Sequence, residues 1–260
     1  MIELQTSHSL SGVPYITYEA LDAYAETVVA DFAPNMLRTP GIINEERFLE
    51  YYLGLQTEYH RICYDRKVLG MTAFNSGYLQ VANEKTGNPE PMPVRKGTVI
   101  LDTSLTVKRN LPRLRFTSMH EGSHWLIHRK AFSESNPFGP VGVYKNQFLA
   151  AKEGRIDYSR SLKARTNIDI IERQADFLSS AILMPRPALR EAYRMFFRLF
   201  GDKPRRIIKG GNNPADDCLA VRLPEYIAKQ FGVPKRAALI RLEKLHAIVD
   251  AKSWRGASNK

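Results

Sequence analysis

The chain has 260 residues, of which 43% are hydrophobic and 25% charged, as in a soluble globular protein with one sizeable domain and a smaller one. No apolar run approaches the roughly 20 residues of a membrane helix, and the first ten residues do not resemble a signal peptide. Cys63 and Cys218 are the only cysteines, which excludes a disulfide framework or a zinc ribbon. We therefore expect a cytoplasmic protein with no membrane contact.

The positive charge is concentrated near the C-terminus. The chain carries 38 Lys and Arg against 27 Asp and Glu, and residues 201–260 hold 13 and 6 of these, a surplus of seven. Such a surplus favours contact with nucleic acid or an acidic protein, but a solvated basic surface explains it equally well.

The N-terminal half combines helices and strands. Residues 18–33 have helical periodicity and stop before Pro34, and Asn44 is a candidate N-cap for a helix over residues 47–59. β-branched or aromatic runs predict strands at residues 61–69, 77–82 and 97–102. The Pro- and Gly-rich residues 83–96 are expected to form an exposed loop.

Helices dominate the second half. Asn110 can cap a helix that has Pro112 in its first turn and runs to about Ala131. Residues 133–165 read as irregular or partly helical, and further helices are expected at residues 167–184 and 187–200. A linker at residues 210–214 precedes helices 224–231 and 234–249, a pattern typical of a helix-turn-helix or of a plain helical hairpin packed on the main domain.

Together these patterns predict an α+β fold, mostly helical with a small mixed β-sheet. Residues 1–200 are expected to form the main domain, with residues 97–187 as the core that carries the motifs below. Residues 201–260 are expected to form a basic, helical, helix-turn-helix-like region.

Residues 115–128, RFTSMHEGSHWLIH, contain an H-E-x-x-H motif made of His120, Glu121 and His124. Residues four apart lie on the same face of a helix, so the two imidazoles can bind one metal ion. Glu121 lies one step round the helix, where it can take a proton from water on the metal. The alternative, a surface helix with two solvated histidines, is disfavoured because the flanking residues are apolar.

A catalytic zinc site needs a third protein ligand. Asp169, Glu172 and Asp176 on the helix at residues 167–184 are the candidates. Glu172 and Asp176 are four apart, so we assign Glu172 as the third ligand and Asp176 as the acceptor that orients a ligand histidine. The alternative is that both are exposed acids paired with Arg173.

His128 lies eight residues after His120, off the face that the two ligands share. We interpret it as a structural residue, and a role as hydrogen-bond partner of a ligand is the minor alternative.

The pairing of RFTSMHEGSHWLIH with IERQADFLSSAILMP resembles the ImmA/IrrE family of zincin-like metallo-endopeptidases. The resemblance covers residues 97–130 and 168–187. It implies that His120, His124 and Glu172 are the zinc ligands and that Glu121 is the catalytic glutamate.

The chain departs from the family pattern at three positions of these motifs. Ser123 stands where the family usually has Gly, Asp176 replaces the common Asn and Ser179 the usual Ala. The segment between the second histidine and the third ligand is also long, which puts the choice of substrate in doubt.

The resemblance implies a zinc-dependent endopeptidase that cleaves a regulatory protein such as a transcriptional repressor. The strand at residues 97–102 is a candidate edge strand that pairs with the substrate backbone. Candidates for the group that stabilises the oxyanion are Tyr144, Tyr158, Arg160 and Arg165.

The alternative is a non-catalytic, zinc-containing regulatory protein that binds a repressor or DNA through residues 201–260. The intact Glu121 favours the enzyme, because a merely structural zinc site does not need a general base.

Overall fold

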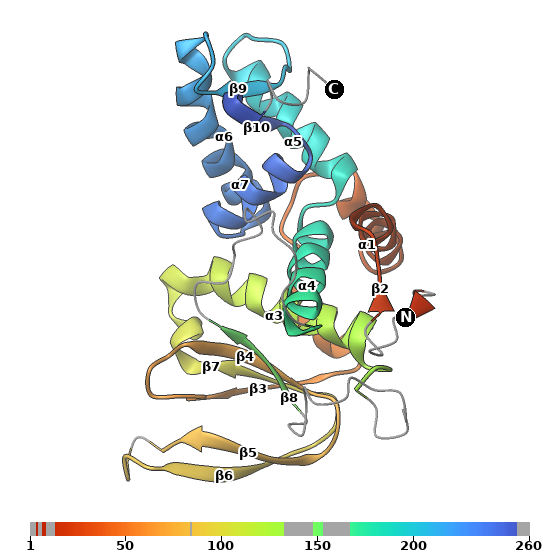
Figure 1. Cartoon of the computed structure of the whole chain (residues 1–260), viewed down its shortest axis with the longest axis vertical. Helices are drawn as coiled ribbons and strands as arrows, with labels where there is room; N and C mark the ends of the chain where they lie inside the picture. Colours follow the sequence, from red (N-terminus) through yellow and green to blue (C-terminus); the bar gives the residue numbers. More distant parts are fainter. Residues whose placement is uncertain are drawn as a thin grey trace.

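The computed structural model describes residue 4 and residues 7–8, 14–83, 85–132, 148–152 and 167–253. These residues form an α+β fold with small sheets, as predicted. Figure 1 shows helices over one face of a four-stranded sheet and a β-hairpin beyond its other face, with a further group of helices at the opposite end of the molecule.

The N-terminal segment pairs β1 (Ser7–His8) with β2 (Pro14–Tyr15) and leads into α1 (Tyr18–Phe32). The hydroxyl of Thr17 caps α1 by accepting a hydrogen bond from the amide of Ala20. The helix ends just before Pro34, which confirms the helix predicted at residues 18–33. Its buried apolar residues recur at spacings of three and four, which points one stripe at the core: Leu21, Ala25, Val28 and Val29.

The second predicted helix is much shorter than expected. Asn44 does cap it, because its side chain accepts a hydrogen bond from the amide of Arg47, but α2 (Glu45–Arg47) and one π-helical turn end at Tyr52. Gly54 then takes a φ of +68°, which a helix cannot contain, and β3 (Gln56–His60) follows. The prediction that the helix reaches residue 59 is therefore wrong.

The four-stranded sheet has the order β3, β7 (Thr98–Asp102), β4 (Val68–Ala73) and β8 (Phe148–Lys152). Strand β7 runs parallel to β3 and antiparallel to β4, so the prediction that residues 97–102 form an edge strand is wrong. The strand predicted at residues 61–69 is also misplaced. Residues 61–67 form a turn, in which the Asp102 carboxylate accepts a hydrogen bond from the amide of Ile62.

Every residue of β7 is buried, because both faces of the sheet are covered. Val99 and Leu101 pack in the apolar cluster of the helices, whereas Ile100 points the other way, into a second cluster under the hairpin. The alternation of strand side chains thus anchors the helices on one face and the hairpin on the other.

The hairpin consists of β5 (Gly77–Ala82), as predicted, and β6 (Pro89–Val94), so part of the loop predicted over residues 83–96 is a strand. Most of the described residues in this range are exposed, as predicted. Proline occupies every second position of β6. On an edge strand this is tolerated, because the remaining amides can still face the partner strand.

Two long helices, α3 (Leu111–His128) and α4 (Asn167–Leu183), cross above the sheet, and α1 packs against α4. Asn110 occupies the N-cap position of α3, but its side-chain amide donates to the carbonyl of Ser104 instead of capping the helix. Pro112 lies in the first turn, as predicted.

The C-terminal part contains α5 (Arg186–Leu199), β9 (Ile207–Lys209), α6 (Pro214–Phe231), α7 (Lys235–Lys244) and β10 (Ile248–Asp250). Helix α6 begins ten residues earlier than predicted, because Asn213 caps it and Pro214 fits its first position. The helix predicted at residues 234–249 ends at Lys244, since His246 has a positive φ of 55° and β10 pairs with β9 in parallel.

One apolar cluster contains side chains from both sides of residue 200, among them Phe177 of α4 and Leu242 of α7. Arg241 of α7 is buried there, 2.5 Å from a carboxylate oxygen of Asp22, and donates to the carbonyl of Met184. A domain boundary at residue 200 and a DNA-reading role for α6 and α7 stay predictions. Among the described helices, not one has the length and hydrophobicity that a bilayer-spanning segment requires.

Candidate metal centre

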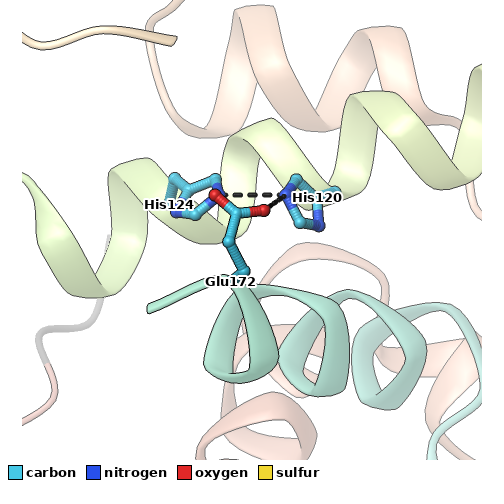
Figure 2. A group of neighbouring side chains, drawn as sticks. All are labelled: His120, His124 and Glu172. Atoms are coloured by element: carbon cyan, nitrogen blue, oxygen red, sulfur yellow. Dashed lines mark hydrogen bonds and ion pairs between the residues drawn. The ribbon is translucent and has the colours of Figure 1, made fainter. Parts of the chain in front are cut away.

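Helices α3 and α4 bring two histidines and a glutamate together (Figure 2). The Nε2 atoms of His120 and His124 lie 2.9 Å apart, and the Glu172 carboxylate reaches over from α4, with its oxygens 3.4 Å and 3.7 Å from these two nitrogens. One donor atom from each residue fits within 4.8 Å of the others. All three side chains are buried, so this group could hold a metal ion away from bulk water.

The sequence positions of α4 explain why its acids face α3. Its apolar stripe packs into the core, and Glu172 and Asp176 lie on the adjoining face, 7% and 8% exposed. The alternative of two solvated acids therefore does not describe this structure. Asp169, the other candidate, is half-buried in the first turn of α4 and does not belong to the group.

His124 is the inner end of a chain of three hydrogen bonds that sequence analysis did not predict. Its Nδ1 lies 3.0 Å from Nδ1 of His128, and Nε2 of His128 lies 2.9 Å from the side-chain oxygen of Gln174. The amide nitrogen of Gln174 donates to the carbonyl of Pro14, 2.8 Å away. This contact is the alternative given for His128 in the sequence analysis, a hydrogen-bond partner of a ligand, and not the structural role that was preferred there.

The outer end of this chain fixes the proton positions. Gln174 donates to Pro14, so its oxygen accepts a hydrogen from Nε2 of His128. Burial lowers the pKa of His128 to about 4 despite its hydrogen bond to Gln174, so the ring is neutral near pH 7 and its Nδ1 accepts from His124. Burial, followed by the positive charge of His120, also holds the pKa of His124 well below its usual value. Neutral His124 thus turns the lone pair of Nε2 towards Glu172.

The other ligand histidine is oriented by a carboxylate. Nδ1 of His120 donates to Asp176, 2.8 Å away, which leaves Nε2 to face the site. This contact matches the position predicted for Asp176 as the residue that orients a ligand.

Two Nε2 lone pairs that meet at 2.9 Å repel each other unless a cation lies beside them. A proton on His120 meets this need, and the pKa of His120 reflects it. Burial disfavours the charged ring, but the carboxylates of Asp176 and Glu172 outweigh burial and raise the pKa well above its usual value. A divalent metal ion meets the same need with three ligands, and the donor set of two neutral imidazoles and a carboxylate fits one.

Glu121 is fully buried on the side of α3 that faces the sheet. The hydroxyl of Thr72, on β4, donates to its carboxylate at 2.6 Å and to its main-chain carbonyl at 3.1 Å. Gly70, on the same strand, makes room for it, because a Cβ there would lie 2.8 Å from Oε1 of Glu121. Sequence analysis missed both residues, since the link between β4 and α3 leaves no local signal.

Two of the departures from the family pattern are accommodated inside the helices. The hydroxyls of Ser123 and Ser179 donate to main-chain carbonyls of the preceding turn, of Met119 and Asp176, so neither leaves a buried polar group unsatisfied. The residues considered for oxyanion stabilisation lie outside the described residues: Tyr144, Tyr158, Arg160 and Arg165.

A scan of the chain against models of known protein families gives no match, and a search of curated proteins gives none either. The resemblance to the ImmA/IrrE family therefore stays a prediction. The case for a function rests on the geometry of this site.

Proposed function

We propose that the chain is a zinc-dependent endopeptidase with a zincin-like fold, related to the ImmA/IrrE family. The observation that carries this proposal is the convergence of two imidazole nitrogens and a buried carboxylate, with Glu121 next to the first of these histidines in the H-E-x-x-H motif. The proposed substrate is a repressor-like regulatory protein in the cytoplasm. The helix-turn-helix-like segment of α6 and α7 and the basic residues 201–260 are the proposed contacts to a repressor or to nucleic acid.

In this proposal His120, His124 and Glu172 hold the zinc, which when bound supplies a Lewis acid that activates water and polarises a peptide carbonyl. Glu121 accepts a proton from the attacking water and passes it to the leaving amine. The hydroxyl of Thr72 holds the carboxylate of Glu121 in one orientation. Catalysis by Glu121 thus depends on β4 as well as on α3.

The ligand assignment is tested by the metal content of the purified protein. We expect close to one zinc per chain in the parent protein and a loss of zinc in His120→Ala, His124→Ala and Glu172→Ala. Asp176→Ala should only weaken binding, because Asp176 contacts His120 on the nitrogen away from the site. Full zinc occupancy in Glu172→Ala would move the third ligand elsewhere.

The enzyme is distinguished from a regulatory binder by Glu121→Gln. Glutamine has the same shape but cannot accept a proton, so this variant should keep its zinc and lose proteolysis of the repressor by about 10²–10⁴-fold. Mass mapping of cleavage products is the measurement, with helix-turn-helix repressors from the same genome as the first substrates. If the parent protein and Glu121→Gln both release the repressor from its operator DNA without cleaving it, the chain is a non-catalytic regulatory protein.

A further inference from the structure

A hollow outside the metal centre is lined by residues of α5, of the segment before β9 and of the turn after α7. Figure 1 shows these elements at the end of the molecule away from the four-stranded sheet. The volume of the hollow is about 430 Å³, within the range of small-molecule sites. Its lining has no residue in common with the metal centre.

The rim of this hollow is strongly basic. Arg186, Arg190 and Arg194 recur every fourth residue along one side of α5, and Arg205 and Arg206 approach from the segment that follows. No acidic side chain is among the described residues that line it.

The acids nearest to these arginines lie outside the lining and neutralise them unevenly. Asp216 lies 2.6 Å from Arg205, and Glu26 lies 2.5 Å from Arg186. Arg194 has only a long contact of 3.6 Å with Glu191.

Arg190 is exposed at the rim and has no acidic partner among the described residues. The rim therefore carries positive charge that the described acids do not balance.

The floor of the hollow is apolar: Leu189, Tyr193, Leu242, Leu245 and Ala247. An apolar floor below a basic rim suits a ligand with a ring at one end and negative charge at the other. The two parallel N–H groups of a guanidinium match two oxygens of a phosphate. Because arginines approach the hollow from α5 and from the segment before β9, more than one phosphate group could be bound.

The neighbouring hollow serves as a comparison. It is larger, about 630 Å³, but Glu19, Asp22 and Glu243 share its lining with Arg186 and Lys244. Mixed charges of this kind do not favour an anion as a purely positive rim does. A lining whose charged residues are all basic is thus a property of the hollow between α5 and α7 and not of this end of the molecule in general.

We propose that the hollow between α5 and α7 binds an organic phosphate, with its phosphate groups on Arg190 and Arg194 and its ring on the floor around Tyr193. Either a free nucleotide or a nucleotide within a nucleic-acid strand supplies this chemistry.

The test uses the full-length protein and two probes. Adenosine triphosphate is titrated by calorimetry, and a short fluorescein-labelled DNA strand by fluorescence anisotropy. Arg190→Gln and the double variant with Arg194→Gln are compared with Arg222→Gln, a matched control that removes an exposed arginine from α6, outside the hollow. Each variant is checked for its circular dichroism and its metal content, which should not change.

We expect Arg190→Gln to weaken binding of at least one probe by about tenfold, the usual worth of a charge-assisted contact, and the double variant to weaken it further. Loss of triphosphate binding identifies a free nucleotide as the source. Loss of DNA binding alone, with the salt dependence of phosphate contacts, identifies a nucleic acid. If the parent protein binds neither probe, or if Arg222→Gln has the same effect as Arg190→Gln, the proposal is wrong.

Discussion

Replacing His128 by leucine tests whether the hydrogen-bond chain behind His124 tunes the metal centre. Leucine offers no acceptor, so Nδ1–H of His124 would remain buried without a partner, at a cost of about 1–3 kcal/mol. His124 can avoid this cost by moving its proton to Nε2, which then no longer offers a lone pair to a metal. At about 1.4 kcal/mol per factor of ten, zinc affinity should fall by roughly 10–100-fold.

The matched control is His128→Asn. Asparagine has nearly the shape of leucine, but its carbonyl oxygen can stand where Nδ1 of His128 stands and accept the same hydrogen bond. Zinc dissociation constants are measured by competition with a chromophoric chelator, and ¹⁵N NMR of the metal-free protein reports which nitrogen of His124 carries the proton. We expect the asparagine variant to bind zinc much more tightly than the leucine variant.

Two results would refute this reasoning. The first is parental zinc affinity in His128→Leu, provided that the variant is folded. The second is equal weakening in both variants, which would mean that His128 acts through packing and not through its acceptor atom.

Three further changes have defined outcomes. Asp22→Ala leaves Arg241 buried without its carboxylate and should lower the free energy of unfolding by about 3–5 kcal/mol in a urea titration. Gly70→Ala places a methyl group 2.8 Å from Oε1 of Glu121, so it should reduce proteolysis while the zinc content persists; full activity would contradict the contact. Burial lowers the pKa of His128 to about 4, whereas the unfolded chain titrates near 6.5. The contribution of neutral His128 to the stability of the metal-free protein should therefore be complete above pH 6.5 and fall by up to about 3 kcal/mol as the pH drops to 4. Urea titrations should show a smaller loss over this pH range in His128→Leu, in which only the contribution of buried His124 remains.

The sequence predicted those parts of the fold that depend on neighbouring residues. Asn44 marks a helix start through a cap that reaches only three residues along the chain, and Pro34 marks the end of α1. The spacing of His120 and His124 is likewise a local property, and so is the apolar stripe of α4 that turns Glu172 towards α3. Local periodicity was sufficient for these features.

The parts that sequence analysis missed are held by distant partners. Strand β3 has no clear alternation of its own and exists because β7, some forty residues later, pairs with it in register. Thr72 and Gly70 matter only because β4 lies against α3. His128 did carry a signal, since it follows His124 at the spacing that links His124 to His120, but its role depends on Gln174 from another helix.

The last acceptor in the chain of hydrogen bonds behind His124 is the main-chain carbonyl of Pro14. Every amino acid has this carbonyl, so no substitution at position 14 deletes the acceptor, and a scan of side chains would pass over it. From the side of residue 14, a shift of the backbone is needed to break the contact, by trimming or lengthening the segment before Thr17. An affinity tag or a protease that displaces this segment would therefore be felt at the metal centre, although every residue of the centre itself is intact.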